Sequence, residues 1–321
     1  MSRSAGRGDV GLDGGPAPTP TLWARERAGQ MVLIAGHTWK EGLRRRIILV
    51  GFLLTAAFVA LYGVGVYYAF RDIAAMAGGS QAGGVSLGAI SIDQNTIRDL
   101  AAYQTLSFGL FISSFLSAML VVFLAAGMIS GDAENGTLQT IVTRPIARTD
   151  ILLGRYLGYA TIYLAYLVLL AGSLLLLTWI FSGYPPPSPV QAVVLLAMEG
   201  LIILSLVSLG SAVLSPVATG VMVLMAYGLA FIGGVVQQIG IFLSNGTAER
   251  IGAAVHYLIP SDAFFRMSLN GLAPRTSILP DFASGPFGNP AAPTVSQVLF
   301  GVAYLVACMA AAAYLFERRD I

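Results

Sequence analysis

The stretch from Gly131 to Gly154, GDAENGTLQTIVTRPIARTDILLG, is a polar insert between two long apolar runs. Asn135-Gly136 is typical of a turn, and the hydroxyl of Thr137 can accept a hydrogen bond from a free backbone N–H at a helix start. Pro145 would end such a helix, because proline has no N–H and clashes with the preceding turn. We therefore expect a short helix over residues 138–142 that lies crosswise between two membrane spans.

The composition is that of a membrane protein. The chain has 321 residues, of which 56% are hydrophobic and only 11% charged, and its mean hydropathy is +0.77; a soluble domain carries roughly 25% charged residues. One cysteine, Cys308, and two distant histidines, His37 and His256, give no basis for a disulfide framework or a metal cluster, so we expect no metal site. The only lysine, Lys40, follows no glycine-rich phosphate loop, so the chain is expected to bind no ATP of its own.

Six apolar stretches are long enough to cross a bilayer, for which a helix needs roughly 20 mostly apolar residues. They run over about Ile47–Phe70, Thr105–Ile129, Ile151–Phe181, Val190–Leu214, Val217–Leu243 and Val295–Phe316. We therefore expect an all-α polytopic membrane protein with six transmembrane helices. Thr149 is expected to cap the third helix and Asp150 to lie in its first turn, where the helix dipole favours a negative charge.

Two segments precede the spans. Residues 1–21 are rich in Gly, Pro, Ser and Ala and are expected to form a flexible cytoplasmic tail. Residues 22–46 carry apolar positions at helical spacing and are expected to form an interfacial helix on the inner leaflet. Its membrane-interface anchors would be Trp39, Arg44, Arg45 and Arg46. A plain cytoplasmic lead-in to the first span is the alternative.

The six-span domain is expected to cover residues 47–321, with two outer loops at 71–104 and 244–294. The second loop is expected to begin with a helix over 248–258, and no strand is expected anywhere. With both termini inside, thirteen of the 18 Lys and Arg residues lie on the cytoplasmic side, which is the usual bias of membrane proteins. We expect a multi-pass protein of the plasma or inner membrane, with both termini in the cytoplasm.

Four motifs carry a resemblance to a known family. The most specific is Asp132-Ala-Glu-Asn-Gly-Thr-Leu138, followed by Arg144-Pro-Ile-Ala-Arg148 and Ile151-Leu-Leu-Gly-Arg155. The others are the basic run from His37 to Arg46, the outer Tyr257-Leu-Ile-Pro260 and the closing Phe316-Glu-Arg-Arg-Asp-Ile321. Together they resemble the permease subunits of ATP-binding-cassette exporters of the type-2 class, in the six-span branch of permeases for multi-copper-enzyme maturation.

The resemblance implies that segment 131–150 is a coupling helix on which a separate ATPase subunit docks. The implied ATPase-coupling residues are Glu134, Gly136, Thr137 and Leu138, with Arg144 and Arg148 at the edge of the contact. Contact with anionic lipid headgroups is the alternative for the arginines, and we favour it for Arg155. The resemblance also implies two ATPases, which bind ATP and Mg²⁺, and a second permease subunit in a homodimer or heterodimer. It favours export, with no catalytic residue in this chain and no nucleic-acid partner.

Glu199 is the only acidic residue well inside a predicted span, where an isolated carboxylate costs at least a few kcal/mol. We expect it to face a cavity or a partner, and we place it with Gln237 and Gln238 on a candidate substrate path. Hydrogen bonding between helices is the alternative for Glu199 and the favoured interpretation for the two glutamines. His256 is expected to be a surface histidine.

Two other classes of protein are alternatives to a permease subunit. A self-sufficient secondary transporter or channel would need more intramembrane charge or broken helices than Glu199 supplies. An intramembrane enzyme would need a Ser–His or paired-carboxylate arrangement, which His37, His256 and Glu199 do not offer.

Overall fold

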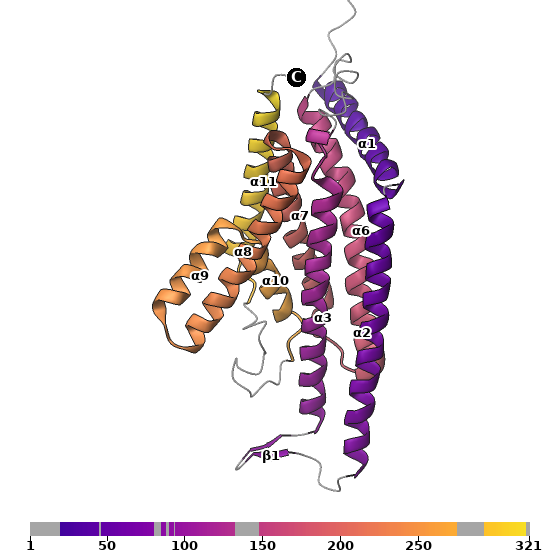
Figure 1. The fold of residues 1–321 in the computed structure, drawn as a ribbon, viewed down its shortest axis with the longest axis vertical. Coiled ribbons are helices and arrows are strands. Elements are labelled where there is room, and N and C mark those ends of the chain that lie inside the picture. The colour runs from indigo at the N-terminus through magenta and orange to yellow at the C-terminus, as the bar shows by residue number, and fades with distance from the viewer. Residues whose placement is uncertain are drawn as a thin grey trace, which may run out of the picture.

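The computed structural model describes residues 20–44, 46–79, 85–87, 90–92, 94–131, 148–274 and 292–318. They form an elongated bundle of helices (Figure 1). Six helices are long and apolar enough to cross a membrane. They are α2 (Arg46–Gly79), α3 (Gln94–Ala125), α6 (Arg148–Ser182), α7 (Pro189–Val213), α8 (Pro216–Phe242) and α11 (Val295–Glu317). They confirm the six predicted spans, including the break at Ser215, and α2 and α3 extend beyond the predictions into the first outer loop.

The bundle has two ends, which we call the terminal end and the distal end. The terminal end holds α1 (Pro20–Arg44), the end of α3, the start of α6, the turn at Ser215 and the end of α11, at the top of Figure 1. The distal end holds the link from α6 to α7 and a short hairpin of strands. The residues that flank segment 132–147 therefore lie at the same end of the bundle as α1 and the last described residues.

The central helices are α3 and α7. In each of them, 61% of the most apolar 18-residue stretch is buried inside the protein. The corresponding share is 17% in α2 and 22% in α11. The outer helices expose large apolar side chains such as Leu53, Val64 and Leu299, which in a bilayer face lipid. Polar groups on α3 and α7 therefore lie in the interior of the protein, where each needs a partner.

Helix α1 packs along the first half of α6. Gly154 lies under Ile34 and Gly158 under Thr38, where any added side chain would collide with α1. Small residues four apart let two helix backbones approach closely, and here they join two helices of one chain. α1 forms most of the helix predicted over 22–46, although Arg46 already belongs to α2, and the place of α1 on the inner leaflet stays a prediction. Trp39 is half-buried against the core, Arg45 lies outside the described residues, and the side chains of Arg44 and Arg46 lie outside the described part of the structure.

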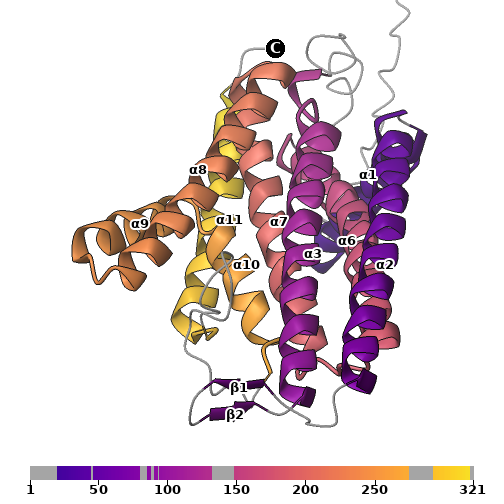
Figure 2. The same ribbon diagram turned by 60° about the horizontal axis from the view of Figure 1, so that its bottom comes forward.

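The first predicted outer loop, residues 71–104, contains two strands, β1 (Val85–Leu87) and β2 (Ile90–Ile92), paired antiparallel with Val85 opposite Ile92 (Figure 2). The expectation of a chain without strands was wrong at this point. Each strand alternates an apolar residue, a serine and an apolar residue, which is the pattern of a strand. Three residues were too few to stand out against the long apolar helices.

The second predicted outer loop, residues 244–294, contains two helices, α9 (Gly246–Leu258) and α10 (Ser261–Asn270). α9 confirms the predicted helix over 248–258, and Asn245 caps it by accepting hydrogen bonds from the N–H groups of Thr247 and Ala248 at 3.1 and 3.3 Å. α10 was not predicted, because it is short and mixes polar and aromatic residues. α9 folds back along α8, and the pair projects from the bundle in both Figure 1 and Figure 2.

Candidate functional site

The predicted ATPase-coupling residues Glu134, Gly136, Thr137, Leu138 and Arg144 lie in 132–147, outside the described residues. The short helix over 138–142 lies there too, so these predictions stay open. The structure does describe the two points at which the segment joins the bundle, namely the turn after α3 and the start of α6.

The turn after α3, residues 126–131, is tied to two other helices. The Ser211 hydroxyl of α7 accepts hydrogen bonds from the N–H groups of Ile129 at 2.9 Å and Ser130 at 3.3 Å. The guanidinium of Arg155 on α6, for which we expected a headgroup contact, donates to the carbonyl oxygen of Met128. Backbone groups beyond a helix end lack helical partners, and here α6 and α7 supply them.

The turn also contacts the start of α8. An added Cβ on Gly127 would lie 3.7 Å from the ring of Pro216, the first residue of α8. A displacement of this turn therefore meets α6, α7 and α8 directly.

The other junction is at Arg148, the first residue of α6. Its Nη1 donates to the carbonyl oxygens of Phe316 at 3.3 Å and Glu317 at 3.4 Å, in the last turn of α11. The free carbonyls at a helix C-terminus favour a cation. Because α6 already begins at Arg148, Thr149 lies inside the first turn and is not the cap that we predicted, whereas Asp150 lies in that turn as expected.

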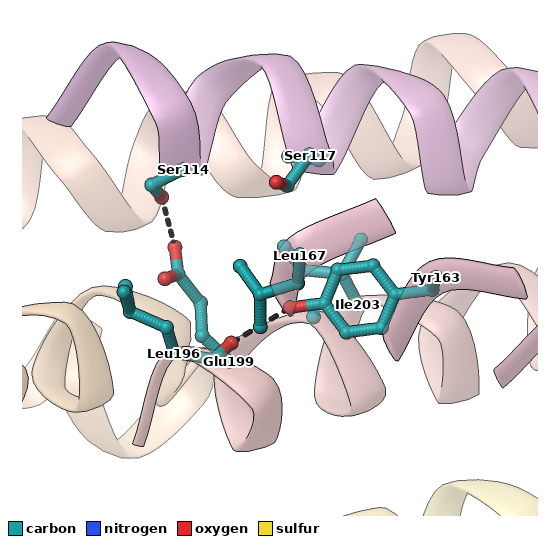
Figure 3. Close-up of a pocket in the computed structure, with 9 residues that line it drawn as sticks. Ser114, Ser117, Tyr163, Leu167, Leu196, Glu199 and Ile203 are labelled. Carbon is teal, nitrogen blue, oxygen red and sulfur yellow. Dashed lines mark hydrogen bonds between the residues drawn. The ribbon is translucent and has the colours of Figure 1, made fainter. Parts of the chain in front are cut away.

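Glu199 lies in the interior, at the meeting point of four helices. Its side chain is 3% exposed, and the Ser114 hydroxyl of α3 donates to its Oε1 at 2.5 Å (Figure 3). The Tyr227 hydroxyl of α8 lies 2.9 Å from the same serine oxygen. On the other side, the Tyr163 hydroxyl of α6 donates to the carbonyl oxygen of Leu196 at 2.7 Å. Glu199, Ser114 and Tyr227 thus form a chain of hydrogen bonds across α7, α3 and α8.

A small cavity lies beside Glu199. Its volume is 10 Å³, which is about the space of one water molecule and far too small for a transported molecule. Ser117 of α3 lines it and, within the described residues, its buried hydroxyl has no hydrogen-bond partner (Figure 3). The helices around Glu199 are therefore closed in this conformation.

The two glutamines predicted to share a path with Glu199 lie elsewhere. The residues that line the Glu199 cavity include neither of them. Gln237 packs against Gly252 of α9, and the Oε1 of Gln238 accepts a hydrogen bond from Nη1 of Arg266 at 3.3 Å. Hydrogen bonding between helices, the favoured interpretation, is confirmed for Gln238.

A buried group of charges joins α8, α9 and α10, and sequence reasoning missed it. Arg266 Nε donates to Asp262 Oδ2 at 2.6 Å, and His256 Nε2 lies 3.0 Å from the same oxygen. Asp262 is 4% exposed and Arg266 8% by side chain. His256, at 16%, is not the surface histidine that we expected. The four-residue spacing of Asp262 and Arg266 on one helix was the available signal.

The fold and these contacts define a polytopic helical membrane protein with a closed interior that contains a few buried polar groups. Residues 32–321 match the family described as ABC-2 family transporter protein, and the chain belongs to that family. As a member it is the membrane permease component of an ABC-2-type transporter and carries no catalysis; in such transporters a separate ATPase subunit binds ATP. Membership of this family decides against the self-sufficient transporter and the intramembrane enzyme.

A stretch of 129 residues is 33% identical to the "Probable ABC transporter permease protein NosY" of Stutzerimonas stutzeri. It covers 40% of this chain and 38% of that relative. The similarity thus spans less than half of either protein.

Replacing Glu199 with leucine should destabilise the protein by about 1–3 kcal/mol, because the buried hydroxyl of Ser114 would lose its carboxylate acceptor. Glu199→Gln, which keeps an acceptor oxygen, should cost less. Thermal unfolding of the purified protein in detergent measures both changes. Ser113→Ala is the matched control, since that buried hydroxyl has no partner in the described structure. A Glu199→Leu protein as stable as the control would contradict this account.

Replacing Asp262 with leucine should cost about 3–5 kcal/mol, because it leaves the buried charge of Arg266 without its carboxylate. The double variant Asp262→Leu with Arg266→Met should recover much of that loss, since no unpaired charge remains. Unfolding curves of the two single variants and the double variant measure the coupling. Simple additivity of the two single effects would show that the ion pair does not act as a unit.

Proposed function

We propose that this permease exports its substrate when a separate ATPase subunit docks on segment 131–150 and displaces it. The observation that supports the proposal is the attachment of both ends of that segment. One end is tied to α6, α7 and α8 through the turn 126–131, and the other to α11 through Arg148. A segment joined in this way transmits a displacement to the bundle instead of absorbing it.

The ATPase contact is formed by Glu134, Gly136, Thr137 and Leu138, with Arg144 at its edge. Arg148 does not contact the ATPase but attaches the segment to the permease, since its guanidinium donates hydrogen bonds to the last turn of α11. The short helix predicted over 138–142 would give the ATPase a rigid surface to hold. The polar residues around it suit a position in water, outside the hydrocarbon.

The terminal end of the bundle lies in the cytoplasm. Most of the basic residues then fall on the cytoplasmic side, in agreement with the usual bias. α1 lies at the inner leaflet, where it braces the first half of α6 through Gly154 and Gly158. The distal end, with the β1–β2 hairpin, α9 and α10, faces the outside of a plasma or inner membrane.

The complete transporter contains two permeases and two ATPases. The exposed apolar faces of the outer helices α2, α8 and α11 face lipid or the second permease, which is a copy of this chain or a related one. The relative of S. stutzeri is by its name a probable ABC transporter permease, in keeping with this role.

Glu199 takes part in the transport path when the helices around it separate. In the closed conformation its carboxyl is held by Ser114. Passage of a substrate requires α3 and α8 to part there, which exposes Glu199, Ser114 and Tyr227 to the path. The substrate then meets a carboxyl group and two hydroxyl groups near the middle of the bundle.

Deleting residues 137–142 should leave the protein inserted and abolish coupled ATP hydrolysis, because the ATPase loses the helix that it moves. Reconstitution of permease and ATPase in liposomes measures ATP hydrolysis and transport together. A variant with six glycine and serine residues in place of 137–142 keeps the chain length and should fail in the same way. Unchanged transport after the deletion would overturn the coupling role.

A further inference from the structure

Helix α8 presents two different faces to its neighbours. One face, with Gly233, Gln237 and Gly240, lies against α9. The other face, with Tyr227, Phe231, Gly234 and Gln238 at spacings of four, three and four residues, lies against α3 and α10. Such spacings line one side of a helix.

The contact between α8 and α9 is a contact of backbones. An added Cβ on Gly240 would meet backbone atoms of Ala248 and Glu249, and one on Gly252 would meet the backbone of Gln237. The turn between the helices is short, and Asn245 caps α9 within it. Backbone atoms and short side chains such as that of Val255 fill the space between the two helices, so α8 and α9 form one rigid hairpin.

The contact of α8 with α3 and α10 is a contact of side chains, arranged in three layers. Nearest the middle of the bundle, Tyr227 meets Ser114, which holds Glu199. Next, the ring of Phe231 lies 5.0 Å from that of Phe111 on α3. In the same layer, the ring of Phe111 lies 6.1 Å from that of Phe265 on α10.

The third layer is the buried ion pair. Gly234 leaves room for Asp262 and Arg266, and Gln238 accepts a hydrogen bond from Arg266 at 3.3 Å. His256 of α9 reaches the same aspartate at 3.0 Å. Both helices of the hairpin are thus joined to α10 through Asp262 and Arg266.

α10 itself is fixed in the bundle. Phe264 fills the space beside Gly301 of α11 and belongs to a buried cluster with Leu195 and Ile202 of α7. The ion pair therefore joins a rigid hairpin that projects from the bundle to a helix anchored in its core. All three layers lie between the same two bodies, so they separate together.

We propose that Asp262 and Arg266 are positioning residues for transport: they hold the α8–α9 hairpin against α10, and this contact opens to release substrate on the distal side. The proposal rests on the proposed function, which puts Glu199 on the transport path, because it places the exit of the substrate on the distal side of Glu199. The start of α8 stays against the terminal-end turn through Pro216, so a displacement of that turn reaches the hairpin along α8.

The test is a reversible crosslink across this contact. In a Cys308→Ser background, Gly234→Cys and Asp262→Cys place two thiols where a side chain on Gly234 would touch Asp262. A disulfide there holds α8 to α10. The matched control is Gly233→Cys with Val255→Cys, one residue along α8, where a side chain would touch Val255 of α9. That disulfide lies inside the hairpin.

Transport per ATP hydrolysed is measured in liposomes with the ATPase, before and after reduction of the same sample. The Gly234–Asp262 crosslink should lower transport at least about fivefold relative to the reduced form of the same protein, the lower end of the range for coupled conformational steps. Because that reduced form lacks the Asp262 carboxylate, its transport should equal that of the Asp262→Cys single variant and not that of the parent. The Gly233–Val255 crosslink should change transport little. Equal transport by the oxidised and reduced Gly234–Asp262 proteins, with the disulfide formed, overturns the proposal. Absence of ATP-driven transport by the Cys308→Ser parent would instead overturn the proposed function.

A second measurement leaves the ion pair intact and covers the case in which the Asp262 variant does not fold. Spin labels at the exposed positions 250 on α9 and 194 on α7 report the distance between the hairpin and the core. That distance should change between the nucleotide-free and ATP-trapped states. The same distance in both states would show that the hairpin does not move, and the proposal fails.

Discussion

A polar group inside a bilayer needs a partner within the protein, because hydrocarbon offers none. This constraint decides which helices of the permease are joined. The carboxyl of Glu199 is bound by Ser114 of α3, and the charge of Asp262 by Arg266 and His256. At the terminal end, Arg148 binds a carbonyl in the last turn of α11 and Arg155 binds a carbonyl in the turn after α3. The bonds of Glu199, Arg148 and Arg155 join elements that are distant in the sequence, whereas Asp262 joins its own helix α10 to the preceding helix α9 through His256.

The bonds also indicate where the bundle is stiff and where it can part. Close backbone contact at glycines joins α1 to α6 and α8 to α9, and such contacts do not slide without strain. Side-chain contacts join α8 to α3 and α10. In our proposal, a displacement of the turn 126–131 passes through Pro216 into α8, and the bundle opens at the face of α8 that has side-chain contacts. If segment 131–150 is the coupling segment, as we propose, it and the Glu199 site are parts of one route.

The sequence predicted well the features that depend on a single stretch of chain. The six spans follow from their length and apolar content, and α9 from its own periodicity. The strands β1 and β2 were missed although Val85-Ser-Leu87 and Ile90-Ser-Ile92 alternate, because three residues give a weak signal. Thr149 was predicted to cap α6 because that helix was expected to start after Arg148, whereas α6 already includes Arg148.

The sequence predicted less of the site, because its contacts are distant in the chain. Ser114 and Glu199 are 85 residues apart, and Arg148 and Phe316 are 168 apart. Nothing near Glu199 points to Ser114, since serines are common in α3. Asp262 and Arg266 are close in sequence, but their burial depends on the fold of α9 over α8, which no local pattern specifies.

The central claim is that segment 131–150 lies in the cytoplasm and is the site at which the separate ATPase subunit docks. Photo-crosslinking from a benzoylphenylalanine at position 138, with position 91 in β2 as the control, tests it most directly in membranes that contain the permease and its ATPase. The account predicts a crosslink to the ATPase from position 138 and none from position 91. A crosslink from position 91, or none from position 138 in a complex that transports, would contradict it.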